Sequence, residues 1–148
     1  MIEIRREKWS ECIDEIMPLC QMVHELVEKD LYGLALNFDA DLYKHSEDAD
    51  QFHCLVMRKD GKPIGFHWLI MYPLARFKGV MQAGTDAIFV HTDHRKHSMK
   101  LIQFSEQYAK DHGCLTWAIA TLDPEYRGKL WAKKGFKKAE TIFIKVMK

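Results

Sequence analysis

The chain has 148 residues, of which 47% are hydrophobic and 29% charged, and its net charge is +1. This composition is that of a globular domain with one sizeable core, and the near-neutral charge excludes an overall attraction to nucleic acid or to an anionic membrane. No apolar run approaches the roughly 20 residues that cross a bilayer, and the charged start MIEIRREKWSE lacks a secretory apolar core. We therefore expect a single domain over residues 1–148, located in the cytoplasm and without membrane contact.

Four cysteines are scattered along the chain without C-x-x-C spacing: Cys12, Cys20, Cys54 and Cys114. This spacing argues against a disulfide framework and against a zinc knuckle. Each cysteine is predicted to behave as a small buried hydrophobe.

The first third of the chain is predicted to form a strand and two helices. Residues 2–6 alternate as a short strand, and residues 9–30 repeat apolar side chains every three or four positions, as in a helix. Ser10 is the expected N-cap of that helix, and Pro18 is a candidate for a kink. A second short helix is expected over residues 39–45.

The remaining two-thirds change to a strand-rich pattern. Two strand-like runs, 52–58 and 63–73, flank Asp60-Gly61, which predicts a hairpin. A strand over 80–90, a helix over 98–112 closed by Gly113, and a buried strand over 114–121 follow. A helix over 125–134 ended by Gly135 and a final alternating strand over 140–148 complete the order β-α-α-β-β-β-α-β-α-β. This order predicts an α/β (α+β) fold with a mixed sheet and helices on its faces.

The segment VHTDHRKHSMKLI, residues 90–102, concentrates donor-rich side chains at a predicted strand-to-helix junction. A helix N-terminus has unpaired N–H groups and partial positive charge, which suit an anion such as pyrophosphate. A solvated polar loop and a nucleic-acid patch are alternative interpretations. A zinc site would use His91, His94 and His97, but we expect their rings to diverge, and no cysteine or acidic cluster completes a ligand set.

The layout of this junction resembles the cofactor loop of the GNAT superfamily of N-acyltransferases. In that family a strand ending in Val leads to Arg/Gln-x-x-Gly-x-Gly/Ala, whose backbone binds the pyrophosphate of acetyl-coenzyme A. Val90 matches the strand end and Arg95 the first loop position, while Ser98 and Lys100 stand where the two small residues usually are. The resemblance implies acetyl-CoA as cosubstrate, no metal, and cofactor contacts from Ile88, Val90, Arg95, Lys96, His97, Ser98, Met99, Lys100 and Trp131.

A second match lies in LWAKKGFKKAE, residues 130–140, which resembles the family's Tyr-x-x-x-Gly-Phe helix ending. Gly135 and Phe136 match, whereas Trp131 stands where the family often has a tyrosine. GKPIGFHWLI, residues 61–70, fits the family's hairpin. Together these segments imply a mostly antiparallel GNAT sheet. The segment ARFKGVMQAGTDAIFVHTDHRKHSMKLI, residues 75–102, is most similar to small members encoded by bacteriophages.

Acyl transfer to an amine needs a proton acceptor and a donor for the oxyanion. The resemblance points to Asp86, at the start of the cofactor strand, as the base, with His67 and His53 as rivals. A backbone N–H between Ile88 and Val90 is expected to serve the thioester oxygen. Trp131 has no acidic proton to give a departing thiolate, so it is expected to act as a wall or as core.

Three functional hypotheses therefore stay open. The first is an acetyl-CoA-dependent N-acetyltransferase whose amine acceptor is unknown. The second is a GNAT-fold binding or regulatory protein without turnover, motivated by the altered loop and by Trp131. The third is acylation of a nucleic-acid base amine, which the neutral net charge disfavours. Residues 72–79, with Arg76 and Lys78, are expected to border the acceptor or to form a solvated hairpin, and a homodimer stays open.

Overall fold

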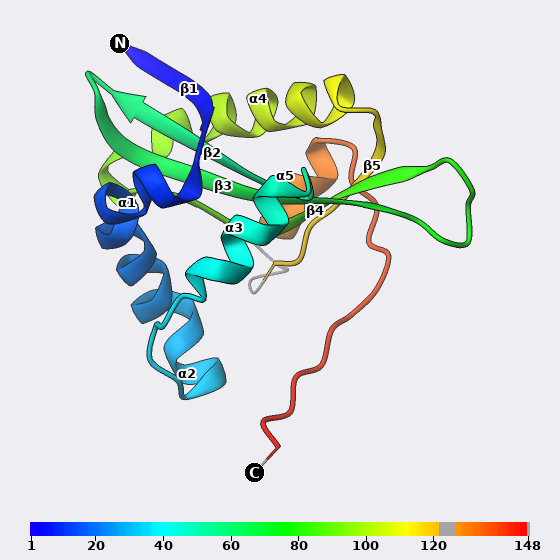
Figure 1. Cartoon of the computed structure of the whole chain (residues 1–148), viewed down its shortest axis with the longest axis horizontal. Helices are drawn as coiled ribbons and strands as arrows, with labels where there is room; N and C mark the ends of the chain where they lie inside the picture. The colour runs from blue at the N-terminus through cyan, green and yellow to red at the C-terminus, as the bar shows by residue number, and fades with distance from the viewer. Residues whose placement is uncertain (122–126, 148) are drawn as a thin grey trace.

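A computed structural model of the chain describes residues 1–121 and 127–147 (Figure 1). Its strands form one sheet in the order β1-β2-β3-β4-β5. The first four are antiparallel neighbours, and β5 runs parallel to β4. The predicted mixed, mostly antiparallel sheet is therefore confirmed. The strands are β1 (Ile2–Glu7), β2 (Phe52–Lys59), β3 (Lys62–Pro73), β4 (Met81–Val90) and β5 (Cys114–Ala118).

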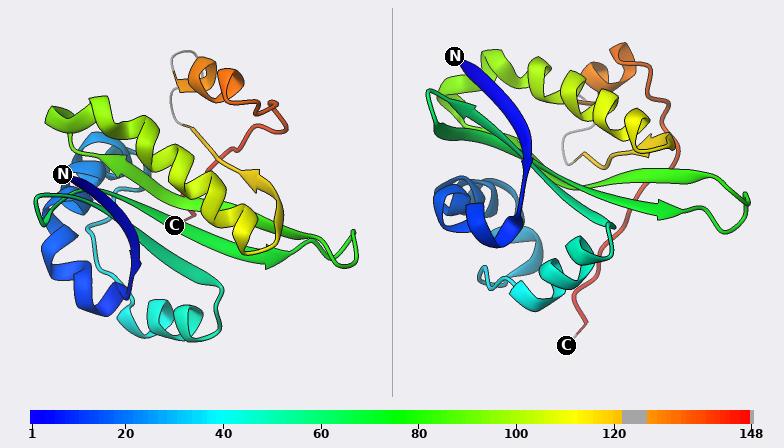
Figure 2. Two further views of the ribbon diagram at one scale, coloured as in Figure 1. Left: turned by 90° about the horizontal axis from the view of Figure 1, so that it is seen from above. Right: turned by 45° about the horizontal axis from the view of Figure 1, so that its top comes forward.

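The helices cover both faces of this sheet, as Figure 2 shows. One face carries α1 (Trp9–Val23), α2 (Lys29–Tyr32) and α3 (Ala40–Asp48). The other carries α4 (Ser98–Asp111) and α5 (Arg127–Lys133). A π-helical turn, His24–Glu28, joins α1 to α2, and a 3₁₀ helix, Thr92–His97, leads into α4.

The long N-terminal helix is present, but its predicted N-cap is wrong. Its N-cap is Lys8, and Ser10 lies inside the first turn. The backbone N–H of Trp9 donates instead to Glu47 Oε2 of α3, at 3.0 Å. The Glu47 carboxylate of the neighbouring helix α3 thus pairs an N-terminal N–H of α1, a role that was expected for the Ser10 hydroxyl. Pro18 lies within α1, whereas the departure from α-helical geometry comes later, at residues 24–28.

Local turn chemistry explains several boundaries. Asp60 and Gly61 have φ values of +50° and +82°, as a two-residue hairpin turn between β2 and β3 requires. The Asp39 side chain accepts a hydrogen bond from Leu42 N–H at 3.0 Å, which caps α3. Gly113, with φ of +81°, ends α4 as predicted.

Alternation along β2 divides the core into two layers. Cys54 and Val56 pack in the aromatic layer under α1, whereas Leu55 and Met57 pack in the layers on the α4 side. The predicted burial of cysteines holds for Cys12, Cys20 and Cys54, while Cys114 is half-buried. An ion-pair network ties the first strands to α1, because the buried Arg58 donates to Glu7 at 2.8 Å and to Glu15 at 2.9 Å.

The C-terminal third departs most from the predicted elements. The predicted buried strand over 114–121 is the shorter β5, a half-exposed edge strand. The predicted helix is α5, and residues 125 and 126 of that prediction lie outside the described residues. The predicted final strand is wrong within residues 140–147, which form no regular element; residue 148 is not described. The apolar side chains of this segment are exposed because no neighbouring strand pairs with it in the described part of the chain.

Candidate active site

The pairing of β4 with its neighbouring strands changes halfway along its length. Its pairing with β5 covers only Met81 to Gly84. From Thr85 onward, β4 has a strand neighbour on its β3 side alone, within the residues that the structure describes. A strand edge of this kind carries unpaired backbone N–H and C=O groups, which can bind an extended ligand in place of a strand.

Asp86 lies where the regular pairing of this strand breaks. Trp68 pairs with Ala87 and Leu69 with Thr85, so Asp86 is the extra residue of a β-bulge. The expectation that Asp86 begins the strand is wrong: it is the sixth residue of ten. A bulge re-aims side chains and is frequent beside active sites, so this position is more distinctive than a strand start.

The surroundings of Asp86 favour its protonated form. The residue is exposed overall, yet protein groups crowd its carboxyl. This desolvation, together with the negative charge of Glu28, raises the pKa of Asp86 above its usual range. A carboxylate with a raised pKa is better matched to accepting a proton near neutral pH than an ordinary surface aspartate.

Aromatic rings border this carboxyl on the α1 face. Tyr43 of α3 stacks on Trp9 with ring centroids 4.6 Å apart, and it meets Trp68 at 5.4 Å. Desolvation and then the charge of Asp86 raise the pKa of the Tyr43 hydroxyl, so the hydroxyl and the carboxylate are close enough to interact. Glu28 belongs to the π-helical turn, an irregularity often found at functional sites.

His67 lies on the opposite face of the sheet, fully buried. The donor and the acceptor in each of its hydrogen bonds can be assigned from the neighbouring bonds. Ser105 Oγ donates to Leu101 O at 2.8 Å, so His67 Nδ1 donates to Ser105 Oγ at 2.7 Å. His67 Nε2 then accepts from Thr85 Oγ1 at 2.9 Å, and Thr85 Oγ1 accepts from Trp117 Nε1 at 2.8 Å.

This chain of donors joins β3, β4, β5 and α4, and it leaves neither ring nitrogen of His67 for a substrate. Burial also lowers the pKa of His67 to about 3, so the ring stays neutral. The geometry therefore gives His67 a packing role beside Thr85. A catalytic role for His67 remains a prediction, without a free nitrogen to support it.

His53, the other rival base, is enclosed in the same way. Its Nε2 donates to Asp50 O at 2.9 Å, and its Nδ1 accepts from the Tyr108 hydroxyl at 2.7 Å. Desolvation lowers its pKa. Of the three predicted bases, Asp86 is exposed, whereas His53 and His67 are fully buried.

The junction between β4 and α4 is more ordered than a glycine-rich loop. Thr92–His97 winds as a 3₁₀ helix, in which His94 N–H bonds His91 O at 2.8 Å and Ser98 N–H bonds Arg95 O. Arg95 folds back on the strand: its Nε donates to Val90 O at 3.2 Å, and its guanidinium lies 5.6 Å from the Phe89 ring centroid. Some backbone donors of the junction are thus already paired.

Positive side chains nevertheless gather at this junction. Arg95, Lys96 and Lys100 are exposed. Desolvation and then the charges of Lys96 and Lys100 lower the pKa of His97, whose Nε2 has no hydrogen-bond partner in the described part of the chain. An anion bound here would offset this repulsion. Ser98 and Met99 open α4, whose N-terminus adds partial positive charge.

Trp131 is packed rather than open. It is 9% exposed, and its ring meets Trp117 at 6.2 Å and Phe136 at 5.4 Å. Trp117 in turn lies 5.4 Å from His67, so the three rings extend the layer that supports β5. Trp131 is therefore a core residue, which is one of the two roles expected for it.

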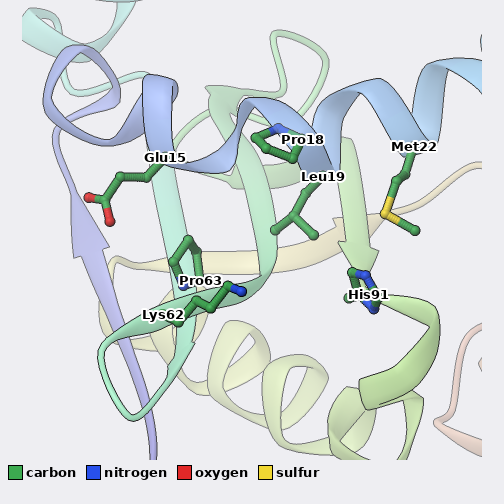
Figure 3. A pocket seen from close by; sticks show the side chains of 7 residues that line it. All are labelled: Glu15, Pro18, Leu19, Met22, Lys62, Pro63 and His91. Carbon is green, nitrogen blue, oxygen red and sulfur yellow. The ribbon is translucent and has the colours of Figure 1, made fainter.

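A recess of about 420 Å³ lies between α1 and the start of β3 (Figure 3). Its walls are mainly apolar, and His91 at the end of β4 reaches its edge. Asp86 does not line it, so we do not place the reaction there. The lining residues are Glu15, Pro18, Leu19, Met22, Lys62, Pro63 and His91.

The histidines of the junction do not make a metal centre in this structure. The rings of His91 and His94 are 5.7 Å apart, and those of His94 and His97 are 6.4 Å apart. Within residues 1–121 and 127–147 no group of three His, Cys, Asp or Glu side chains is arranged to hold a metal ion. None of the helices in these ranges is long and apolar enough to span a membrane.

The family model of the acetyltransferase (GNAT) family matches residues 19–136. The chain therefore belongs to the GNAT family of acetyltransferases, whose cosubstrate is acetyl-CoA. No curated protein matches the chain.

Solved structures agree with this fold. A ribosomal-protein-alanine N-acetyltransferase from Brucella melitensis biovar Abortus 2308 has a TM-score of 0.78 at 20% identity, covering 100% of this chain and 99% of its own. An aminoglycoside acetyltransferase from an uncultured soil metagenomic sample, in complex with sisomicin, has a TM-score of 0.76 at 16% identity, covering 99% and 97%. The acetyltransferase AAC(6')-Iy, in complex with a bisubstrate analogue of CoA, has a TM-score of 0.71 at 19% identity, covering 100% and 99%.

Sequence reasoning did not find Tyr43, Glu28 or Thr85. Tyr43 and Asp86 are 43 positions apart, and Glu28 follows what reads as an ordinary amphipathic helix. Only the packing of α1 and α3 on one face brings these groups to β4. Thr85 is adjacent to the predicted base Asp86, but the bulge that separates the directions of the two side chains depends on pairing with β3.

Proposed function

We propose that the chain transfers an acetyl group from acetyl-CoA to the amine of a cationic acceptor, with Asp86 as the proton acceptor. The observation that carries this proposal is the open edge of β4, with Asp86 on its bulge and a basic junction at its end. Extended ligands add to such edges through backbone hydrogen bonds. The pantetheine arm would follow Thr85 to Val90, and the pyrophosphate would lie at residues 95–100.

The residues of the junction fit an anion, although they differ from a glycine loop. Because Arg95 Nε and part of the backbone are already paired, charged side-chain groups would contribute more of the phosphate contacts here. Lys96, Lys100 and the terminal guanidinium nitrogens of Arg95 are the exposed groups available for this. Ile88 and Val90 would contact the arm through their backbone, and Trp131 would support the wall formed by β5.

The acceptor would approach from the α1 face. Asp86 and Glu28 place negative charge there, and Tyr43, which is partly exposed, offers an aromatic ring, a combination that attracts a protonated amine. Before attack the amine must lose a proton, which Asp86 would take directly or through a water molecule. The neutral nitrogen then forms the new C–N bond as the C–S bond breaks, with a backbone N–H near Ile88 facing the carbonyl oxygen. As the amide forms, the nitrogen loses its second proton to solvent; because Trp131 supplies no acid, the thiolate would leave and take its proton from solvent as well.

Calorimetry with acetyl-CoA tests cofactor binding. Arg95→Ala combined with Lys100→Ala should weaken binding by about tenfold or more, since charge-assisted contacts to phosphate are among the stronger polar contacts. Lys110→Ala is the matched control: this exposed lysine lies on the same helix but pairs with Glu106. Unchanged affinity in the double variant would remove the phosphate site from residues 95–100.

A binding role without turnover is the second candidate, and the 3₁₀ helix at the junction is the observation that favours it. Micromolar binding of acetyl-CoA without acetylation of any amine in a panel of polyamines, aminoglycosides and peptide N-termini would support that candidate. Acylation of a nucleic-acid base amine would appear as labelled acetyl transferred to oligonucleotides. A cytoplasmic location and a bacteriophage origin stay predictions.

A further inference from the structure

The recess between α1 and the start of β3 is a feature that the proposed reaction does not use. It encloses about 420 Å³, within the range of roughly 300–1,000 Å³ that small-molecule sites occupy. Its apolar walls come from α1, with Pro18, Leu19 and Met22, and from β3, with Pro63 (Figure 3). A second hollow, of about 400 Å³, is lined almost entirely by charged side chains. The first recess is therefore the one that suits the apolar part of a ligand.

Two hydrogen-bond donors stand at this apolar recess. Lys62, the first residue of β3, is exposed, and Figure 3 shows its ammonium directed toward the middle of the recess. The second donor is the ring of His91. Its Nδ1 accepts a hydrogen bond from Asp93 N–H at 3.1 Å, so Nε2 carries the proton of the neutral ring. In the described part of the chain neither donor has an acceptor, so both can meet a ligand.

The Glu15 carboxylate also lines the recess, but it is already paired. Its two oxygens accept from Arg58 Nη1 at 2.9 Å and from Arg58 Nη2 at 3.0 Å. The Glu7 that shares this guanidinium is paired with Arg5 as well. Figure 3 shows the Glu15 carboxylate pointing away from Lys62. Among the lining residues Lys62 therefore carries the unpaired charge, which favours an anionic ligand.

We propose that this recess binds an amphipathic carboxylate, a small molecule with one carboxylate on an apolar body. The apolar body lies against Pro18, Met22 and Pro63, and the carboxylate accepts hydrogen bonds from Lys62 Nζ and His91 Nε2. Burial of the apolar body supplies affinity, and the charge-assisted bonds select an anion over a neutral molecule. The ligand differs in charge from the cationic acceptor proposed for the open part of β4. The inference stands independently of the proposed acetyl transfer.

A chemical-shift titration with octanoate tests the site, in protein labelled with ¹³C at its methionine methyl groups. The Met22 methyl should shift saturably, with a Kd of about 1 mM or below. 1-Octanol has the same chain without the carboxylate and should bind about tenfold more weakly or worse. The exposed methyls of Met1 and Met147 are internal controls and should not move. No saturable shift of Met22, or equal binding of octanoate and 1-octanol, would overturn the proposal.

Variants of the two donors test how the carboxylate is held. Lys62→Glu should weaken octanoate binding by about tenfold or more, because it reverses the charge. Lys78→Glu is the matched control, since it changes the net charge equally at an exposed lysine beyond the other end of β3. His91→Asn keeps a side-chain acceptor for Asp93 N–H but lacks the Nε2 donor, and it should weaken binding by about threefold or more. Equal affinity in Lys62→Glu and Lys78→Glu, or wild-type affinity in His91→Asn, would contradict this placement of the carboxylate.

Discussion

The two faces of the sheet treat titratable groups in opposite ways. On the α4 face, His67 is sealed between Ser105 and Thr85, with each ring nitrogen paired and its charged form excluded. On the α1 face, Asp86 stands on a bulge beside Tyr43 and Glu28 and keeps access to solvent. Both groups have shifted pKa values. A shifted pKa therefore indicates a catalytic group only when that group also has a polar atom that a substrate can reach.

Variants of the sealed face should therefore change stability, and variants of the open face should change turnover. The largest stability effect is expected at Trp131, which packs on Trp117 beside His67. Trp131→Ala should lower the free energy of unfolding by about 3–5 kcal/mol, because truncation of a buried aromatic leaves a cavity. Urea denaturation measures this. A loss below about 1 kcal/mol would show that the ring is not core.

Removal of the buried imidazole comes next. His67→Leu should lower the free energy of unfolding by about 1–3 kcal/mol, because the Ser105 and Thr85 hydroxyls each lose a partner. Turnover per folded molecule should stay close to wild type at a temperature where the variant is folded. A stable but inactive His67→Leu would restore His67 as a catalytic candidate and break the comparison of the two faces.

The pH dependence of stability sharpens the same point. Burial lowers the pKa of His67 from about 6.5 to about 3. Between these values the unfolded chain binds a proton that the folded chain excludes, so this group makes stability fall as pH drops from about 6.5 toward 3. The His67→Leu variant lacks this contribution. Its urea midpoint should fall less steeply than that of wild type over that range; parallel curves would show that His67 is not sealed.

The smallest effect is expected for a change that preserves the packing of Trp131. Trp131→Phe should keep most of the turnover and of the affinity for acetyl-CoA, because an aromatic ring remains against Trp117 and Phe136. Steady-state kinetics at saturating acetyl-CoA measure this. A folded Trp131→Phe with no activity would assign the indole a direct part in the reaction.

Local sequence signals predicted the regular part of the fold well. The Asp60-Gly61 turn and the Gly113 helix end are decided by residues close together in the chain, and the structure confirms both. The cap of α1 was mispredicted because Glu47, 38 positions away from Trp9, supplies it. The final strand was mispredicted because alternation shows that a segment can be a strand but not whether a neighbour is present.

Some features of the candidate site could likewise be predicted from local sequence, and others depend on tertiary packing. The basic junction and Asp86 could be found from the sequence, since a strand-to-helix turn and its charges are local. The bulge, the directions of Thr85 and Asp86, and the approach of Tyr43 depend on strand register and on helix packing across the sheet. Burial of His67 likewise depends on Ser105, which reaches it from a helix 38 positions later.

The central claim, that the open face carries the chemistry, is tested most directly by the pH–rate profile of Asp86→Asn. We expect turnover at neutral pH to fall by roughly 10²-fold or more, the usual range for a lost general base, with the affinity for acetyl-CoA unchanged. The variant's rate should recover as pH rises and free amine becomes available, while wild-type turnover should decline as pH falls through the raised pKa of Asp86. Turnover per folded molecule near the wild-type value across the whole profile would contradict the account.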